Sequence, residues 1–166
     1  MKKLSGFLIV VVFAMLTVAA WGYANRPTSE PALPRVIHGF AFQPYQKDQD
    51  AIAGEDPTSA QIDADLKLLA GTTRAVRTYS SIGTLGEIPA LARKHGLKVM
   101  LGSWIDSDRE RNDREVEAAI RLANTNRNVT RILVGNEVVL RGDLPVEDLI
   151  AHIDRVRAAT KQPVST

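Results

Sequence analysis

An amide and a carboxyl group stand side by side after an apolar run, at Asn136 and Glu137. The run before them, Arg131-Ile132-Leu133-Val134-Gly135, is typical of a buried strand. A carboxyl that lies half buried at the end of such a strand is disfavoured in its charged form, as a general acid requires. The same pattern also fits a strand that continues into an ordinary polar loop, so spacing alone leaves both interpretations open.

Metal and cofactor chemistry have little support elsewhere in the sequence. The three histidines show neither the H-x-H nor the H-E-x-x-H spacing of a metal site; they are His38, His95 and His152. Cysteine is absent, which excludes a disulfide framework, a thiolate zinc site and a cysteine nucleophile. No phosphate-binding G-x-x-x-x-G-K-[ST] motif occurs, and Ala41-Phe42-Gln43-Pro44 follows the first expected strand in place of a glycine-rich loop. We therefore expect no cofactor and no metal.

Strands and helices are expected to alternate through most of the chain. Apolar runs predict strands at residues 36–42, 75–79, 97–102, 131–135 and 162–166. A capping box, Thr58-Ser59-Ala60-Gln61, predicts the start of the first helix of this region. Two further helices are expected at about 85–95 and 108–124, and a third with Pro145 at its N1 position. Strands separated by helices pair in parallel through right-handed crossovers, so a doubly wound sheet and a (β/α)8 barrel are the candidate folds.

Functional residue types gather at the C-terminal ends of these expected strands, which favours the barrel. Tyr79 ends the second strand, Trp104 follows the third, and Asn136-Glu137 follows the fourth. Barrel enzymes take their catalytic groups from such positions. A barrel needs about 250 residues, whereas this chain has 166 and ends as a fifth strand begins. We therefore expect an α/β fold over residues 35–166, a (β/α)8 TIM barrel of which about the first four βα units are present.

A separate segment precedes this domain. Between Lys3 and Arg26 lie 22 residues without a charge, which is long enough to cross a bilayer core that needs about 20 apolar residues. The two lysines before the span favour a domain on the periplasmic or extracellular side of the cell membrane. A signal peptide, cleaved after Gly22-Tyr23-Ala24 to release a secreted protein, is the alternative. Residues 1–24 are thus predicted to be a membrane anchor or signal peptide, and the proline-rich residues 25–34 a linker.

The charge balance argues against nucleic acid as a partner. The chain has 21 Lys and Arg residues and 19 Asp and Glu residues. Two of the basic residues precede the apolar span, which leaves the rest of the chain with 19 basic and 19 acidic residues and no net charge. A domain that binds a polyanion keeps a basic surplus on its folded part. We therefore expect no binding to nucleic acid.

Several segments together resemble glycoside hydrolase family 17, the β-1,3-glucanase family. Leu133-Val134-Gly135-Asn136-Glu137, followed by Leu140-Arg141-Gly142-Asp143, is similar to the family's acid/base motif. The segments similar to its second and third strands occur in order and at fitting spacing: Arg77-Thr78-Tyr79-Ser80, His95-Gly96-Leu97-Lys98-Val99 and Gly102-Ser103-Trp104. The similarity covers residues 35–166, the N-terminal half of the family's barrel, and points to the bacterial branch found beside or fused to membrane glucan synthases.

The resemblance implies a retaining mechanism on β-1,3-glucan. Glu137 would be the acid/base that protonates the leaving oxygen and then activates water or an acceptor sugar. Asn136 would match the amide that hydrogen-bonds the sugar 2-hydroxyl, and Arg77 would match the arginine that polarises the nucleophile. Tyr79 and Trp104 would form subsite walls, because sugars stack on aromatic rings, although ordinary core packing explains Trp104 equally well.

The family's nucleophile is a second glutamate near the end of strand seven. We expect this chain to lack both strand seven and that glutamate. The glutamates that lie in expected loops or helices do not fit that role: Glu55, Glu87, Glu110, Glu115, Glu117 and Glu147. We therefore expect a hydrolase or glucanosyltransferase module that is inactive as these 166 residues alone. The alternative is a non-catalytic, membrane-tethered part that binds carbohydrate or serves a β-glucan synthase system. The expected partners are a β-glucan oligo- or polysaccharide and a membrane glucan synthase.

Overall fold

The computed structural model describes residues 2–32, 34–51 and 53–166, and the chain divides into two units, residues 1–33 and 34–166. The first unit contains helix α1, Lys2–Ala24. Within it, Gly6–Ala24 is long and apolar enough to cross a membrane by length and composition, with a mean hydropathy of 2.2. Large apolar side chains on all sides of α1 are exposed, including Phe7, Phe13 and Trp21. A helix without a polar face is typical of a membrane span or a signal sequence.

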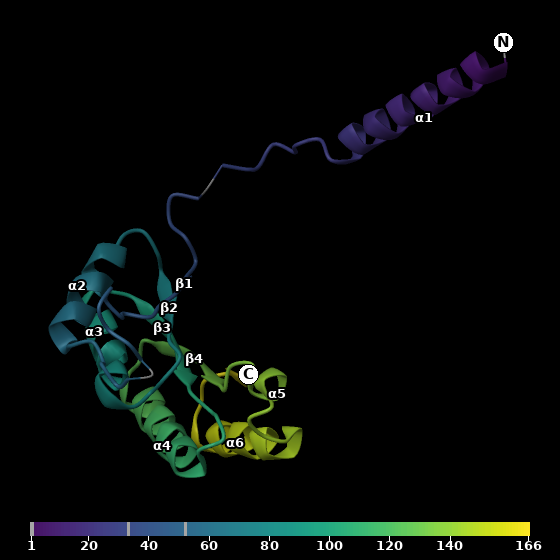
Figure 1. Ribbon diagram of the computed structural model, residues 1–166. Helices are drawn as coiled ribbons and strands as arrows, with labels where there is room; N and C mark the ends of the chain where they lie inside the picture. Colours follow the sequence, from purple (N-terminus) through teal and green to yellow (C-terminus); the bar gives the residue numbers. More distant parts are fainter. Residues whose placement is uncertain (1, 33, 52) are drawn as a thin grey trace. The chain divides into compact units, whose positions relative to one another are not determined.

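The second unit is built on a sheet of five parallel strands (Figure 1). The strands are β1 (Phe40–Ala41), β2 (Ala75–Arg77), β3 (Lys98–Ser103), β4 (Val129–Val134) and β5 (Val164–Ser165). Their spatial order equals their order in the chain. A doubly wound sheet reverses its strand order at a switch point, whereas consecutive neighbours are the arrangement of a (β/α)8 barrel. The predicted α/β fold of successive βα units is therefore confirmed.

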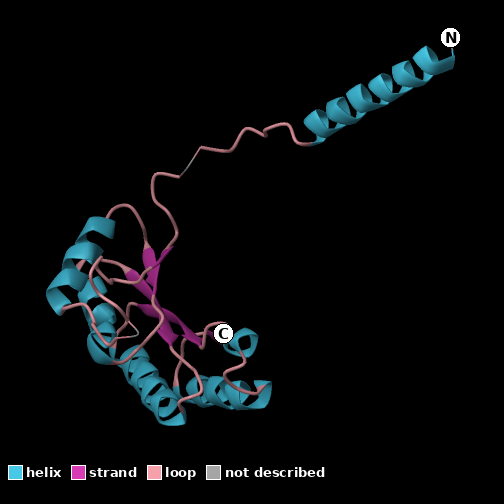
Figure 2. Ribbon diagram, viewed as in Figure 1, coloured by secondary structure: helices cyan, strands magenta, loops and turns pink. Residues whose placement is uncertain are grey.

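The connections between the strands are helical (Figure 2). Helix α2 begins at the predicted capping box, in which the Thr58 hydroxyl accepts from the Gln61 backbone N–H and the Gln61 side chain accepts from the Thr58 N–H. Asp108 caps α4 in a similar way by accepting from the Arg111 N–H. The helical segments are α2 (Ser59–Leu69), the 3-10 helix η1 (Gly83–Glu87), α3 (Ile88–Lys94), α4 (Arg109–Thr125), α5 (Val138–Arg141) and α6 (Val146–Ala159).

The hydrophobic core lies between the sheet and these helices. Alternate strand residues are fully buried there, namely Val76, Val99, Leu101, Ile132 and Val134. The helices contribute apolar residues at helical spacing, among them Ile62, Leu66, Val116, Ala119 and Val156. The strand residues between the buried ones, such as Arg77, Met100 and Leu133, are only half buried. Strands of a barrel turn one face to the helices and the other to the interior, and it is this second face that carries Arg77.

Some boundaries differ from those predicted from the sequence. The first strand is limited to Phe40–Ala41, with an isolated bridge from Ile37 to Thr73. The helix expected at 85–95 is divided into η1 and α3, because Pro89 has no N–H to donate to the preceding turn. Pro145 occupies the N-cap position of α6, with φ −57° and ψ 151°, instead of N1. The short helix α5 was not predicted, since its four residues are too few to show a period.

A glycine allows the ends of β2 and β3 to approach each other closely. A β-carbon at Gly102 would lie 2.2 Å from the backbone oxygen of Thr78, a separation that real side chains do not reach. Because glycine has no β-carbon, the two backbones can approach here. The Gly102 N–H donates to Thr78 Oγ1 at 2.9 Å, and the Gly102 carbonyl accepts from Ser81 Oγ at 2.7 Å. These contacts bring together the two strand ends that carry Tyr79 and Trp104.

Candidate active site

The chain turns sharply at the end of β4, and Glu137 lies in this turn. Gly135 and Glu137 both have positive φ, at 83° and 56°, and Glu137 is the only such non-glycine residue in the described part of the chain. A left-handed conformation costs a residue with a side chain about 1–2 kcal/mol. At Gly135 a β-carbon would lie 2.6 Å from Val138 Cγ2, so glycine is required there. Backbone strain of this kind is concentrated at functional sites.

The carboxyl of Glu137 is exposed, so the half-buried position expected from the sequence is wrong. Glu137 stands beyond the last residue of β4, Val134, and serves as the N-cap residue of α5. The strand itself is buried, but the turn after it projects beyond the sheet edge. The carboxyl of Glu137 is therefore accessible at the C-terminal end of the strands, which is where barrel enzymes bind their substrates.

Arg77 and Asn136 are joined directly, although they lie 59 residues apart. Arg77 Nη2 donates a hydrogen bond of 2.8 Å to Asn136 Oδ1, from the interior face of β2 to the turn after β4. The guanidinium carbon of Arg77 also lies 4.7 Å from the centre of the Tyr79 ring. Arg77 Nε is buried and has no hydrogen-bond partner among the described residues. The structure thus brings together Arg77, Tyr79, Asn136 and the neighbouring Glu137, and leaves Arg77 with an unused donor.

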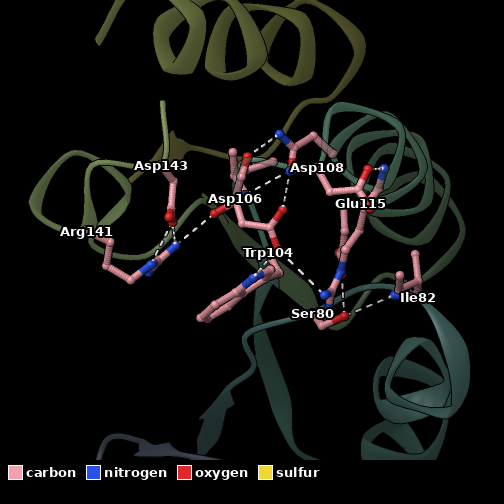
Figure 3. A network of polar contacts seen from close by, with 11 residues as sticks. Ser80, Ile82, Trp104, Asp106, Asp108, Glu115, Arg141 and Asp143 are labelled. Atoms are coloured by element: carbon pink, nitrogen blue, oxygen red, sulfur yellow. Dashed lines mark hydrogen bonds and ion pairs between the residues drawn. The ribbon is translucent and has the colours of Figure 1, made fainter. Parts of the chain in front are cut away.

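Trp104 belongs to a second group of contacts (Figure 3). Its indole Nε1 donates to Asp106 Oδ2 at 3.0 Å, and the Arg141 guanidinium carbon lies 4.6 Å from its ring centre. Arg141 in turn donates from Nε to Asp143 Oδ2 at 2.7 Å. Arg141 joins this group to the first one, because its Nη1 donates to the backbone carbonyl of Asn136 and its backbone N–H donates to the carbonyl of Glu137 at 2.8 Å. The sequence had placed Arg141 and Asp143 in a motif without a role, because the contacts of Arg141 with Trp104 and Ile105, more than 30 residues away, leave no local signal.

Glu115 lies beneath the ends of β2 and β3, on helix α4, and its side chain is fully buried. One carboxylate oxygen accepts from the Ser80 hydroxyl and the other from the Ser81 backbone N–H, the latter at 2.8 Å (Figure 3). Burial raises the pKa of the Glu115 carboxyl above its ordinary value, while these hydrogen bonds and the charge of Arg111 act in the opposite direction. Sequence analysis had set Glu115 aside as a helix residue and missed this role.

Replacing Glu115 should test its structural role through its pH dependence. Because its pKa is raised in the folded state, Glu115 stabilises the fold below its ordinary pKa and loses that contribution as the pH rises through the raised value. We expect Glu115→Ala to lower the free energy of unfolding by about 2–4 kcal/mol, since two buried donors lose their acceptor. Glu115→Gln should lower the free energy of unfolding by less. As the pH rises, the wild type should lose stability relative to Glu115→Gln, whose amide does not titrate. Urea unfolding at several pH values measures both, and a difference that does not vary with pH would contradict this.

General acid/base chemistry is what this arrangement can support. It combines an exposed carboxyl, an amide, a guanidinium and two aromatic rings at the C-terminal ends of β2, β3 and β4. In the described part of the chain, no group of three or more His, Cys, Asp or Glu side chains could hold a metal ion. The fold and the strand-end positions of these residues are those of (β/α)8-barrel enzymes.

The chain belongs to the BtgE/BtgC glycoside hydrolase domain family, whose model matches residues 39–166. Among curated proteins it is similar to the probable glucan endo-1,3-beta-glucosidases btgC of Aspergillus flavus and Aspergillus oryzae. Each is 26% identical over 159 residues, which cover 85% of this chain and 23% of the relative. The resemblance to glycoside hydrolase family 17 is thereby confirmed at the level of the family.

Solved structures give the same result. The chain is similar to an active-site mutant of the Rhizomucor miehei beta-1,3-glucanosyltransferase in complex with laminaritriose, with a TM-score of 0.61 and 25% identity. It is also similar to the glycoside hydrolase family 17 beta-1,3-glucanosyltransferase from Rhizomucor miehei, with a TM-score of 0.59 and 25% identity. Each match covers 74% of this chain and 44% of the solved chain. The chain therefore spans about a quarter of the length of the curated relatives and less than half of the solved ones.

Proposed function

We propose that this chain is the acid/base-bearing part of a retaining enzyme that acts on β-1,3-glucan, with Glu137 as the acid/base. The observation that carries the proposal is the turn after β4, where Glu137 is held in a left-handed conformation beside the Arg77–Asn136 hydrogen bond. The family membership of residues 39–166 and the printed activities of the relatives support the substrate class. Hydrolysis and glucanosyl transfer use the same first step and differ in the acceptor, water or sugar, that reaches the intermediate.

Asn136 and Arg77 are proposed to act on the reacting sugar and on the nucleophile, respectively. Asn136 would hydrogen-bond the sugar 2-hydroxyl through its amide nitrogen, since its oxygen is occupied by Arg77. The unused Nε donor of Arg77 supports a second carboxylate at this place, because a buried guanidinium N–H requires an acceptor. That carboxylate would be the nucleophile of the retaining mechanism, about 5–5.5 Å from Glu137. We propose that this second carboxylate belongs to a part of the protein outside these 166 residues, equivalent to the part of the relatives that this chain does not cover.

A non-catalytic function in carbohydrate binding is the second candidate. The observation that favours it is the pair of half-buried rings, Tyr79 and Trp104, each with a guanidinium over one face. Rings fixed in this way present their other faces to a sugar whether or not a bond is cleaved. A membrane glucan synthase as partner is proposed from the sequence resemblance alone.

Product analysis distinguishes these functions. The protein encoded by the whole reading frame is incubated with laminaritriose and with laminarin, and the products are separated by chromatography. Shorter oligosaccharides indicate hydrolysis, and longer ones indicate transfer. Binding of laminaritriose without any new product, in a frame that encodes no second glutamate at a strand end, would support the binding function and contradict the catalytic one.

We propose that residues 1–24 place this domain outside the cytoplasmic membrane, as an anchor or a cleaved signal. Helix α1 has the length and hydropathy for this, and two lysines stand before its apolar part. An alkaline phosphatase fused after Thr166 should be active, since that enzyme matures only in an oxidising compartment. Carbonate extraction then separates the two forms, because an anchored product stays in the membrane pellet. An inactive phosphatase fusion, together with activity of a reporter that functions only in the cytoplasm and is fused at the same place, would contradict this orientation.

A further inference from the structure

The left-handed backbone of Glu137 is held from both sides by a single residue, Arg141. The Arg141 backbone N–H donates to the carbonyl of Glu137 at 2.8 Å. Its side-chain Nη1 donates to the carbonyl of Asn136, in the peptide unit on the other side of the Glu137 α-carbon. The angles φ and ψ of Glu137 describe how these two peptide units are rotated relative to each other. A residue that binds both carbonyls therefore restricts both angles.

The guanidinium of Arg141 is itself fixed by contacts with the loop after β3. Nη2 donates to the Ile105 carbonyl at 2.9 Å, and the guanidinium lies 4.6 Å from the centre of the Trp104 ring. Asp143 closes the arrangement with an ion pair of 2.6 Å to Nη2. Arg141 ends the short helix α5 and Asp143 follows it (Figure 3). Their side chains are only 28% and 21% exposed. Only the planar fork of arginine offers donors in this many directions, which lysine does not.

We propose that Arg141 is a positioning residue that fixes the backbone at Glu137 and so directs its carboxyl, with the loop after β3 as its support. The proposed effect on catalysis rests on the function proposed above, while the effect on the backbone does not. Arg141 reaches no sugar in this role and acts only through Glu137. Asp143 and Trp104 contribute by holding the guanidinium.

Nuclear magnetic resonance tests the backbone effect without any substrate. The full chain is labelled with ¹³C-glutamate in detergent micelles, and the signal of Glu137 is assigned by its loss in Glu137→Gln. The one-bond Cα–Hα coupling of Glu137 differs between positive and negative φ and should indicate a positive φ in the wild type. In Arg141→Met it should move to the value of an averaged, mainly negative φ. In Arg157→Met, whose exposed side chain pairs only with Asp154 among the described residues, it should not change.

Two further variants keep the test decisive if Arg141→Met does not fold. Arg141→Lys retains the backbone N–H and one donor group, and should give an intermediate coupling. Asp143→Asn leaves both contacts of Arg141 with the Glu137 peptide units and removes only the ion pair, so its effect should be smaller still. A Glu137 coupling that stays at its wild-type value in Arg141→Lys or Arg141→Met would overturn the proposal.

A double-mutant cycle in the active protein tests the catalytic consequence. Arg141→Ala should lower kcat about 10- to 100-fold with little change in KM, since positioning affects the transition state more than ground-state binding. In the Glu137→Gln background the same change should cost less than about 3-fold, because the group it positions no longer transfers a proton. Added guanidinium should restore part of the activity of Arg141→Ala. Equal losses in both backgrounds would show that Arg141 does not act through Glu137, whereas an unchanged kcat in Glu137→Gln would instead contradict the proposed function.

Discussion

Replacing Glu137 by glutamine should lower kcat on laminarin by about 10²–10⁴-fold in the protein that supplies both carboxylates, because the amide cannot protonate the leaving oxygen. The glutamine has nearly the same size, and the position is exposed, so the free energy of unfolding should change by less than about 0.5 kcal/mol. Reducing-sugar release from laminarin measures the loss, and urea unfolding verifies the fold. As a matched control, Glu147→Gln on the exposed first turn of α6 should leave the activity unchanged.

The size of the loss should depend on the leaving group. A sugar is a poor leaving group and requires protonation, whereas an activated aryl alcohol leaves with little help. The first step with an aryl β-glucoside should therefore be much less affected, and the glycosyl-enzyme should accumulate because its hydrolysis still needs the general base. Rapid-mixing experiments should show a burst of the aryl alcohol followed by slow turnover. Near-normal turnover of natural glucan by Glu137→Gln would exclude Glu137 as the acid/base and reduce the family resemblance to a shared fold.

The second large effect is expected at Arg77. Replacing it by methionine should lower kcat by about 10²–10³-fold, the usual cost of losing one fixed charge or donor at a reacting group. The change removes the hydrogen bond to Asn136 and the cation above the Tyr79 ring, and leaves no donor for the nucleophile. Arg77→Lys keeps the charge without the planar fork and should recover only a small part of this loss. Steady-state kinetics on laminarin oligosaccharides measure both variants.

Arg131 offers a matched control for Arg77, since it also lies on a strand of the sheet but is exposed. Arg131→Met should keep both kcat and KM within about 2-fold of wild type, as for ordinary surface changes. If Arg77→Met raises KM and leaves kcat unchanged, Arg77 binds substrate uniformly and does not act on the nucleophile. If it only lowers the unfolding temperature, its hydrogen bond to Asn136 is structural.

The fold was predictable because its elements have local signals. The capping box at Thr58 and the apolar stripe of Ile62 and Leu66 identify α2 without reference to the rest of the chain. Strand order then follows from short helical crossovers, which leave few topologies open. The ends of the elements were less certain, as at Pro145, because proline is compatible with both the N-cap and N1 positions.

The site was predictable only in part. Arg77, Asn136 and Tyr79 come together as the strand positions suggest, since the parallel strands of one sheet, here β2 and β4 on either side of β3, end at the same edge. The exposed carboxyl of Glu137 and its left-handed backbone could not be predicted, because they depend on a turn beyond the strand. Glu115 and Arg141 were missed for a related reason. Glu115 binds Ser81, which lies 34 residues away, and Arg141 binds Ile105, which lies 36 residues away, and no local pattern marks such contacts.

The stereochemistry of azide rescue tests the role of Glu137 most directly. Azide needs no general base and can attack the glycosyl-enzyme that Glu137→Gln accumulates from an aryl β-glucoside. If Glu137 is the acid/base, azide should restore turnover and the product should be the β-glucosyl azide, because the nucleophile is intact and two inversions retain the configuration. The anomeric proton coupling of the product measures this. An α-glucosyl azide would identify Glu137 as the nucleophile, and no rescue at all would show that Glu137 carries neither role.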